Sequence, residues 1–384
     1  MRILHTSDWH VGRTIRGRSR AVEHEAVLAE IVAVARAEAV DLVLVAGDQF
    51  DTAAPAPDAE RIVWRALLDL AEVAPVVVVA GNHDNPFRLD AVAPLLTAAG
   101  VHSGARLVRP DDGGLLTVQV ASGETARIAL LPFLSQRGIV RADELMGLDA
   151  DQHAGRYDAR AKVIIERLCE GFNTDTVNLA VAHLMVAGGV LGGGERTAHT
   201  IFDYAVAATA FPDSAHYVAL GHLHRTQSVP AACPAWYSGS ALQLDFGEAG
   251  DSKAVVLVEA APGRPAEVRT VELSAGRRLR TLRGTLDELE ALAGTTGDDY
   301  LRVIVPGQQR AGMAEQVREW FDNAIDVGVE APDSASPRPD APWRLGRSPV
   351  ELFSEYLSDR DAADERVLAL FYELFDAAHA PDAA

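Results

Sequence analysis

Cysteine and lysine are both scarce in this 384-residue chain. The two cysteines, Cys169 and Cys233, form no C-x-x-C or similar motif, so neither a disulfide framework nor a thiolate metal site is expected. Cys169 lies in an expected helix and is interpreted as a small apolar filler. Lysine occurs only at Lys162 and Lys253 against 33 arginines, an imbalance that indicates coding bias rather than nucleic-acid chemistry.

Several kinds of segment are also absent. No stretch approaches about 18 consecutive apolar residues, so no transmembrane helix is expected. The chain enters its first strand directly, without the charged and apolar regions of a signal peptide. No G-x-x-x-x-G-K-[ST] motif occurs, which excludes an ATP-binding P-loop. These absences predict a cytoplasmic protein without a membrane partner.

Negative charge dominates, with a formal net charge of −20. Net charge governs solubility and steering more than fold, so binding of a polyanion would depend on local basic clusters. One cluster near the N-terminus comprises Arg13, Arg16, Arg18 and Arg20, and a later one comprises Arg277, Arg278, Arg280 and Arg283. Each cluster either contacts backbone phosphates or is an ordinary solvated loop.

Apolar runs alternate with helical patterns in the first hundred residues. Runs at 2–7, 41–46 and 75–80 indicate buried strands, and 21–40 and 57–73 have the apolar spacing of helices. This alternation predicts parallel strands covered by outer helices. Further strands are expected at 115–120, 126–132, 177–182, 217–221, 235–239 and 253–260, and a further helix at 158–172. We therefore predict an α/β fold with two packed sheets flanked by helices.

Short polar blocks follow five of these strands. They are Asp8-Trp9-His10, Gly47-Asp48, Gly81-Asn82-His83-Asp84, His183, and Gly221-His222-Leu223-His224. Residues at the carboxyl ends of strands in an open α/β sheet lie at its usual ligand-binding edge. On an extended backbone the first and third residues of the first block would also point to the same side.

The side chains of these blocks suit a pair of cations. Oxygen and imidazole ligands without a thiolate favour manganese, iron or magnesium over structural zinc. Asp48 has two carboxylate oxygens and can bridge two metals, which at about 3.5–4 Å apart can share a hydroxide and clamp a phosphate ester. His83 is expected to face the substrate, with Asp84 orienting its ring. The alternative is that these are ordinary loop and core polar groups, most plausibly for His183, which stands alone.

The blocks resemble those of the SbcD family, calcineurin-like metallophosphoesterases that act as nuclease subunits in bacterial double-strand-break repair. The resemblance extends to His183-Leu184-Met185-Val186-Ala187-Gly188-Gly189, Glu195-Arg196 and Ser348-Pro349-Val350-Glu351-Leu352-Phe353. It covers most of the chain and is weakest at 100–170 and 290–345. No ligand position departs from the family pattern.

This resemblance implies a metallophosphoesterase fold with two Mn²⁺ ions, for which Mg²⁺ or iron could substitute. Asp8, His10, Asp48 and His224 would hold one ion, and Asp48, Asn82, His183 and His222 the other. His83, supported by Asp84, would stabilise the transition state or protonate the leaving oxygen.

The implied activity is a Mn-dependent 3′–5′ exonuclease on duplex DNA ends, with endonuclease cutting of single strands and hairpins, in repair, recombination and replication. The implied partners are DNA and an SbcC-type coiled-coil ATPase. The chain would form a homodimer within a heterotetramer and would be associated with the nucleoid.

Three segments follow the expected nuclease domain, residues 1–275. Residues 276–331 predict a small α/β domain, with strands 278–283, 299–305 and 325–331 and helices 285–293 and 313–323. The resemblance implies a cap that helps to bind DNA, with Arg278 and Arg280 as candidate contacts, whereas the sequence alone allows a packing module.

Residues 332–349 contain five prolines and are expected to form a linker. Residues 350–378 then predict two amphipathic helices, whose apolar positions include Leu352, Phe353, Leu370, Phe371 and Leu374. This tail either folds back on its own domain or docks on another chain. The resemblance implies the base of the SbcC coiled coil, contacted as a helix in a groove.

Two other functions remain open. A phosphatase or cyclic-nucleotide phosphodiesterase would use the same metals but has no obvious need for the residues after 276. A binding scaffold that retains its metals structurally predicts the loss of His83 or Asp84, and both are present.

Overall fold

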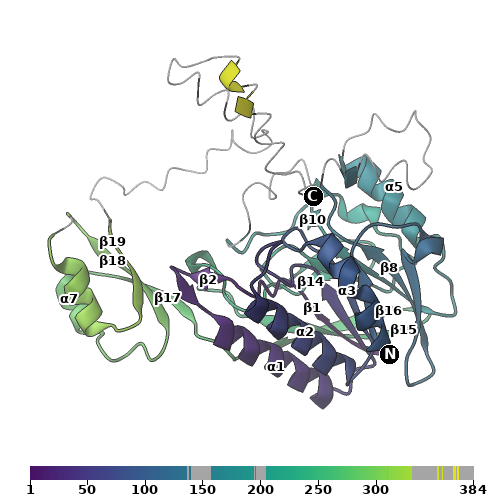
Figure 1. The fold of residues 1–384 in the computed structure, drawn as a ribbon, viewed down its shortest axis with the longest axis horizontal. Coiled ribbons are helices and arrows are strands. Elements are labelled where there is room, and N and C mark those ends of the chain that lie inside the picture. Colours follow the sequence, from purple (N-terminus) through teal and green to yellow (C-terminus); the bar gives the residue numbers. More distant parts are fainter. Residues whose placement is uncertain are drawn as a thin grey trace.

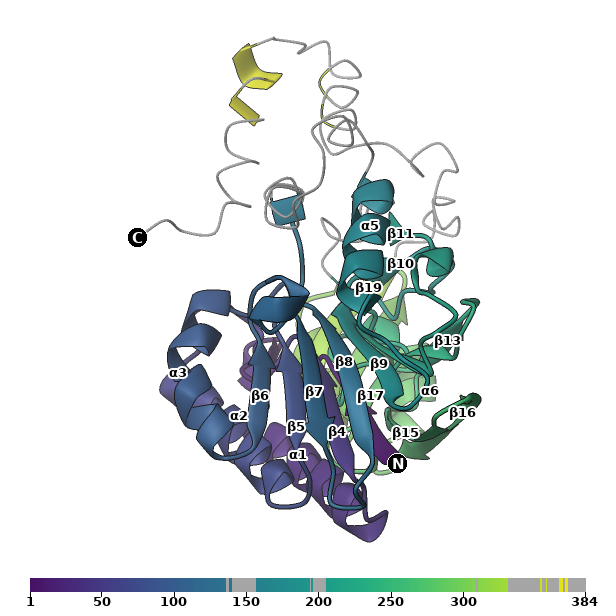
Figure 2. The same ribbon diagram turned by 90° about the vertical axis from the view of Figure 1, so that its right-hand side faces the viewer.

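The computed structural model describes residues 1–135, 138–139, 157–193, 195, 205–308, 310–330, 353, 357, 366–368 and 370–371. Two mixed six-stranded sheets pack face to face, and helices cover their outer surfaces (Figures 1 and 2). This arrangement confirms the α/β fold class predicted from the sequence. Within the described residues no helix is both long and apolar enough to span a bilayer.

The first sheet has the strand order β16-β15-β1-β4-β5-β6. Its strands are β1 (Arg2–Thr6), β4 (Leu42–Ala46), β5 (Val76–Val79), β6 (Val101–Gly104), β15 (Ala254–Ala261) and β16 (Arg264–Glu272). The first four are parallel, and β15 and β16 extend the sheet in antiparallel fashion. Its outer face is covered by α1 (Ala21–Ala37), α2 (Pro57–Ala71) and α3 (Pro86–Ala98). The sequence did not predict α3 or β6, because Pro94 interrupts the helical pattern and only Leu89 and Leu96 of α3 are buried.

The second sheet has the order β13-β14-β12-β9-β8-β7. Its strands are β7 (Leu115–Gln119), β8 (Thr125–Leu131), β9 (Val177–His183), β12 (Tyr217–Gly221), β13 (Gln227–Val229) and β14 (Ala235–Tyr237). Helix α5 (Tyr157–Cys169) packs on its outer face and carries Cys169 as a buried free thiol. Short elements complete the core: β2 (Thr14–Ile15), β3 (Arg18–Ser19), β10 (Met185–Val186), β11 (Ala205–Val206), η1 (Pro110–Asp112), η5 (Ala208–Ala210) and η6 (Phe246–Glu248).

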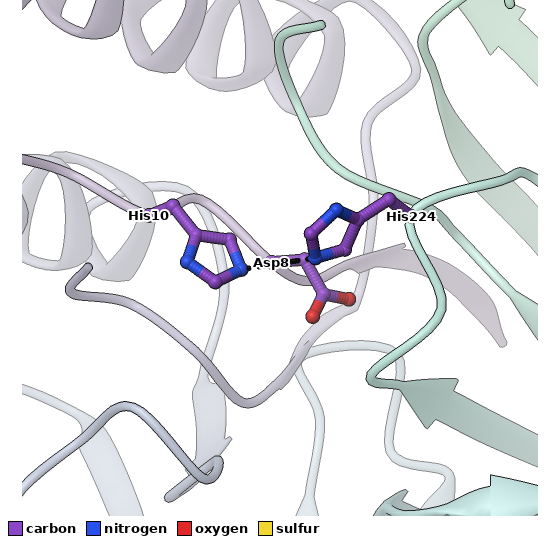
Figure 3. A group of neighbouring side chains, drawn as sticks. All are labelled: Asp8, His10 and His224. Atoms are coloured by element: carbon purple, nitrogen blue, oxygen red, sulfur yellow. Dashed lines mark hydrogen bonds between the residues drawn. The ribbon is translucent and has the colours of Figure 1, made fainter. Parts of the chain in front are cut away.

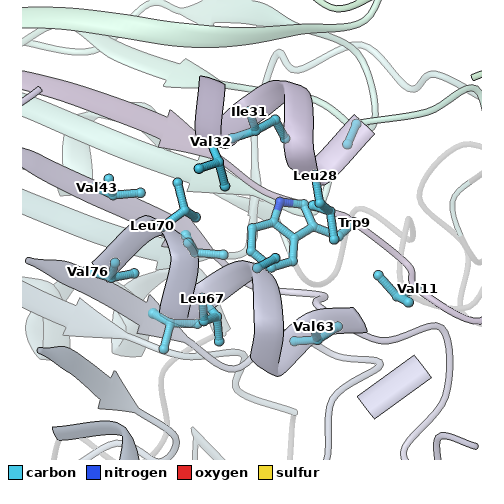
Figure 4. Close-up of a cluster of buried hydrophobic side chains, with 14 of the residues drawn as sticks. Trp9, Val11, Leu28, Ile31, Val32, Val43, Val63, Leu67, Leu70 and Val76 are labelled. Carbon is cyan, nitrogen blue, oxygen red and sulfur yellow. The ribbon is translucent and has the colours of Figure 1, made fainter. Parts of the chain in front are cut away.

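Trp9 anchors the loop that follows β1. Its ring is fully buried in the layer between the first sheet and its helices, among Leu28, Val63 and Leu67 (Figure 4). The indole Nε1 donates to Thr6 Oγ1 at 3.0 Å, so the polar end of this large side chain is also satisfied. Because Trp9 occupies the core, its two neighbours in the chain are held at the end of the strand.

A third, parallel sheet lies beside the core, beyond the β2–β3 hairpin (Figure 1). It consists of β17 (Leu279–Arg283), β18 (Tyr300–Pro306) and β19 (Ala324–Glu330), with α6 (Leu286–Glu290) and α7 (Met313–Trp320). Its own apolar cluster includes Leu289, Leu301, Val303 and Val317. These elements coincide with those expected for residues 276–331, whereas a DNA-binding role for this unit stays a prediction.

Arg20 connects this unit to the core and does not face solvent. Its side chain is fully buried, and its guanidinium donates to Glu23 and to the carbonyl oxygens of Gln243 and Arg277. The side-chain oxygen of Gln243 in turn accepts from Leu279 N at 2.7 Å. The predicted DNA contact of Arg20 is therefore wrong, because a buried guanidinium with three protein acceptors has no access to a phosphate.

Two buried histidines of the core make stability depend on pH. Burial lowers the pKa of His5 to about 3 and that of His24 to about 4, from an ordinary value of 6.5. The unfolded chain binds these protons more readily than the folded one. The stability that depends on keeping these two histidines neutral is therefore fully present above about pH 6.5 and is lost progressively as the pH falls toward 3.

We expect the free energy of unfolding, measured by urea denaturation in chelator, to fall below pH 6.5 by up to about 1.4 kcal/mol per pH unit for each of these histidines. His5→Asn should show a shallower slope, because it keeps an acceptor for the Tyr217 hydroxyl, 2.9 Å from Nδ1, but does not titrate. His102→Asn, at a half-buried histidine of β6, is the control. Equal slopes in His5→Asn and the wild type would contradict this prediction.

Candidate metal centre

The seven predicted metal ligands lie together where strands of both sheets end. One set follows β1, β4 and β5 of the first sheet, and the other lies at the ends of β9 and β12 of the second. All are buried except Asn82, which is half-buried: Asp8, His10, Asp48, Asn82, His183, His222 and His224. Residues from positions 8 to 224 of the chain thus share one site.

A first group of possible ligands consists of Asp8, His10 and His224 (Figure 3). One ligand atom from each lies within 4.8 Å of the others. The Nε2 atoms of the two imidazoles face each other at 3.1 Å, and His10 Nε2 lies 3.6 Å from Asp48 Oδ2. Two ring nitrogens that converge beside two carboxylates form a donor set that fits a divalent cation.

A second group surrounds Asn82. Its side-chain oxygen lies 2.9 Å from both His183 Nε2 and His222 Nδ1. The Oδ2 atom of Asp48 is 3.5 Å from His183 Nε2, so this carboxylate faces both groups. The site can therefore hold two cations that share one carboxylate, as the ligand sets implied by the resemblance require.

Hydrogen bonds to Nδ1, on the side of the ring away from the site, orient the imidazoles of His183 and His224. Nδ1 of His183 donates to the carbonyl oxygen of Ala46 at 2.8 Å, and Nδ1 of His224 lies 2.9 Å from Glu248 Oε1. These bonds place the protons on Nδ1 and turn Nε2 of both rings into the site. Such supporting partners fix the tautomer of a metal-binding histidine and raise its basicity.

The charges of the cluster strongly perturb one another. Burial raises the pKa of Asp8 to about 6, against the lowering effect of the nearby histidines. Burial alone would lower the pKa of His183, but the charge and hydrogen bond of Asp48 outweigh it and raise that pKa to about 9. The carboxylates of the site thus strongly favour a positive charge beside them, which is the environment that a divalent cation requires.

The backbone of the site is strained. Asp8, His10, Asp48 and His222 have φ values of 50°, 46°, 53° and 111°, a region that residues other than glycine rarely adopt. The extended conformation expected for the first block is therefore wrong, because these left-handed residues aim the side chains instead. Strain of this kind persists where the surroundings fix it, as the bond from Asp8 N to Gly47 O at 2.9 Å does here.

A glycine precedes a ligand in three of the five blocks because no side chain would fit there. A Cβ on Gly47 would lie 2.2 Å from His183 Nδ1, and one on Gly81 would lie 2.1 Å from Asp48 Oδ1. A Cβ on Gly221 would lie 1.8 Å from the carbonyl oxygen of Ala46. The turns at the strand ends must therefore pass close to the ligands of the neighbouring blocks.

The predicted orientation of His83 by Asp84 is wrong. Nδ1 of His83 lies 2.7 Å from the carbonyl oxygen of Asp51, which orients the ring. The carboxylate of Asp84 accepts backbone N–H bonds from Gly81, Phe50 and Gln49 instead and ties two strand-end loops together. The ring of His83 packs edge-on against that of His10, with centroids 4.5 Å apart, so His83 does border the site.

Comparisons with known proteins agree with this geometry. Residues 1–226 match the calcineurin-like phosphoesterase family. The SbcD subunit of the SbcCD nuclease of Bacillus subtilis is 40% identical over 286 residues, which are 73% of this chain and 71% of the relative. This chain belongs to the SbcD family. The SbcD subunits of Rhodobacter capsulatus and Escherichia coli K12 are each 32% identical, over 92% and 76% of this chain and 94% and 73% of the relatives.

Membership in the SbcD family confirms the enzyme class predicted from the sequence, a metal-dependent phosphodiester hydrolase.

The arginines predicted to contact DNA differ in their surroundings: some form ion pairs and others are exposed to solvent. Arg13 pairs with Asp51 at 3.2 Å beside the cluster, whereas Arg16 pairs with Asp326 of β19 at 2.8 Å. Solvent-exposed positions are held by Arg18, Arg278 and Arg280.

Three of the five apolar tail residues predicted to dock on a partner are described. The rings of Phe353 and Phe371 stack with centroids 4.2 Å apart, and the side chain of Leu370 is 53% exposed. Leu352 and Leu374 lie outside the described residues. Docking of this tail stays a prediction.

Sequence reasoning missed several residues that support the centre. Asp51 provides the carbonyl for His83, Glu195 accepts from His224 N at 3.0 Å, and Glu248 contacts the ring of His224. Glu195 lies in a stretch that carries the family resemblance, a signal that could have identified it. Glu248 follows its histidine by 24 residues and belongs to no motif.

Proposed function

We propose that this chain is the nuclease subunit of an SbcCD-type complex that hydrolyses DNA phosphodiester bonds with two metal ions. The observation that carries the proposal is the shared position of Asp48, which faces both ligand groups. We further propose Mn²⁺ as the metal, 3′–5′ exonuclease action on duplex ends, and endonuclease action on single strands and hairpins. DNA and an SbcC-type ATPase are the proposed partners.

Two cations held here would supply an activated water and a clamp for the scissile phosphate. The protein holds the ligands in place before any substrate arrives, through the Ala46 and Glu248 bonds behind the histidines. Nδ1 of His83 donates a hydrogen bond to the carbonyl oxygen of Asp51, so we assign proton transfer to the leaving oxygen to Nε2 of the ring in its imidazolium form, which becomes the neutral Nδ1–H imidazole. Asp84 supports this step indirectly by holding the loop that carries His83.

Basic side chains would guide the DNA backbone to this centre. Arg13 lies next to it, and Arg18 is exposed on the adjoining hairpin. Arg16 bridges the hairpin to Asp326 of the third sheet, which brings the exposed Arg278 and Arg280 into the same part of the molecule. With a net charge of −20, the chain is expected to need its partner for much of its DNA affinity.

His83→Ala should lower cleavage of duplex DNA by about 10²–10⁴-fold, the usual contribution of a general acid or base. Because the ring is assigned to the substrate rather than to a metal, the variant should still bind two Mn²⁺ per chain. Metal content by elemental analysis and cleavage of a labelled duplex would be measured on the same preparation. Loss of one metal would show instead that His83 is a ligand, as its place near His10 and Asp48 allows.

Deletion of residues 350–384 should abolish copurification with an SbcC-type ATPase and leave the metal content unchanged. The reason is that the side chain of Leu370 is exposed, and that the two amphipathic helices predicted from the sequence could not bury their apolar stripe against each other alone. Replacing Leu370 alone by Asp offers a milder test in the full chain. Undiminished copurification of the deletion variant would exclude the tail as the docking segment.

A further inference from the structure

Glu248 is fully buried behind the metal centre, where three donors hold its carboxylate. Its Oε1 lies 2.9 Å from His224 Nδ1. Its Oε2 accepts from Lys253 Nζ at 2.6 Å and from Leu244 N at 3.1 Å, and the Ser240 hydroxyl, 3.3 Å away, has the carbonyl oxygen of Leu242 as its nearer acceptor at 2.8 Å. A carboxylate with this many partners is held in one position, and it transmits that position to the imidazole.

Lys253 has an equally complete set of bonds. Its Nζ donates to Glu248, to the carbonyl oxygen of His224 at 3.0 Å and to Ser240 Oγ at 2.9 Å, and the residue is only 7% exposed. Three acceptors around one nitrogen match the three protons of an ammonium group, and a planar guanidinium has a different geometry. In a chain with 33 arginines, one of its two lysines thus lies where an ammonium group is required.

Glu248 and Lys253 form a buried ion pair, in which Oε2 of Glu248 lies 2.6 Å from Nζ of Lys253. The other oxygen of the same carboxylate, Oε1, accepts a hydrogen bond from His224 Nδ1 at 2.9 Å. The Nε2 atom of that ring, which faces His10 Nε2 at 3.1 Å, is left as the metal-binding nitrogen.

We propose that Glu248, held by Lys253, is the positioning residue of His224 and sets the affinity of one of the two metal positions. Lys253 holds Glu248 and His224 together, because its Nζ donates both to the carboxylate of Glu248 and to the backbone carbonyl oxygen of His224. The other metal position depends on His183, which a backbone carbonyl supports instead. This inference rests on the proposed two-metal centre and predicts that the two positions respond differently to one substitution.

Mn²⁺ binding to the full chain would be measured by equilibrium dialysis, and the pairing of bound ions by electron paramagnetic resonance. The wild type should bind two ions with a spin-coupled signal. Glu248→Gln should weaken one of them by about 10- to 100-fold, as expected for a supporting partner, and should show an uncoupled ion at intermediate Mn²⁺. Lys162→Met, at the exposed lysine of α5, is the matched control and should bind as the wild type does.

A double variant separates positioning from simple stability. Lys253→Met leaves a buried carboxylate without its cation and should lower the thermal midpoint. Adding Glu248→Gln removes the unpaired charge, so the double variant should recover stability while its weaker Mn²⁺ position remains weak. The double variant also supplies the metal measurement if Glu248→Gln alone does not fold.

The outcomes distinguish this inference from the proposed function. If Glu248→Gln or the double variant folds and binds two ions with wild-type affinity, Glu248 does not position His224, and the proposed metal centre still stands. Failure of the wild type to bind a pair of ions would instead overturn the metal centre, and the inference with it.

Discussion

We expect Asp48→Asn to lose phosphodiester hydrolysis by more than about 100-fold, beyond the loss typical of residues that only support metal ligands. Asp48 Oδ2 lies 3.6 Å from His10 Nε2 and 3.5 Å from His183 Nε2, so it is the carboxylate placed between the two groups. Its Oδ1 also accepts from His83 N at 2.8 Å. Asparagine has nearly the same shape but removes the charge that would bind both cations.

The same substitution should change the metal content of the protein. Elemental analysis of Asp48→Asn should find fewer than two tightly bound ions, whereas Asp111→Asn, at an exposed aspartate of η1, should match the wild type. Retention of two ions and of cleavage by Asp48→Asn would mean that this carboxylate does not bridge them.

Gly221→Ala is expected to be among the most destabilising single-methyl changes in the chain. The added Cβ would lie 1.8 Å from the carbonyl oxygen of Ala46 and 2.9 Å from His183 Nδ1, and therefore inside the bond that joins these two residues. Gly221 ends β12 of the second sheet and Ala46 ends β4 of the first, and these two packed sheets cannot move apart freely. We expect a loss of about 3 kcal/mol or more in the free energy of unfolding, the upper end for overpacking.

Gly250→Ala provides a matched comparison. No heavy atom lies within 4 Å of the Cβ that it would add, so its free energy of unfolding should stay within about 0.5 kcal/mol of the wild-type value. Urea denaturation of both variants, with metal content measured alongside, would make the comparison. Wild-type stability in Gly221→Ala would show that the two sheets yield at this contact more easily than the structure indicates.

The convergence of the seven candidate ligands was largely predictable, because each of them lies next to the strand that positions it. A buried apolar run followed by a short polar block places that block at the sheet edge, and five such blocks specify one cluster. The orientation of individual residues was less predictable. Asp84 was expected to bond the ring of His83, but the ring bonds a backbone carbonyl, which leaves no trace in the sequence.

The remaining failures have similar physical causes. Arg20 was grouped with exposed arginines, although the Glu23 three residues later is its buried partner and an i,i+3 pair could have suggested this. Helix α3 has a short buried face and an internal proline, so its pattern did not distinguish it from a loop. The network of Glu248 and Lys253 forms only when the segment after β14 folds back on His224, a long-range contact that local spacing does not encode.

Cleavage of an end-labelled DNA duplex in Mn²⁺ is the most direct test of the proposed function. The wild type and Asp48→Asn would be compared, each with and without an SbcC-type ATPase and ATP. We predict cleavage by the wild type, alone or with the partner, and none by the variant under any condition. Hydrolysis of a small phosphodiester in place of the duplex would contradict the nuclease assignment and would favour a small-substrate phosphodiesterase built on the same metal centre.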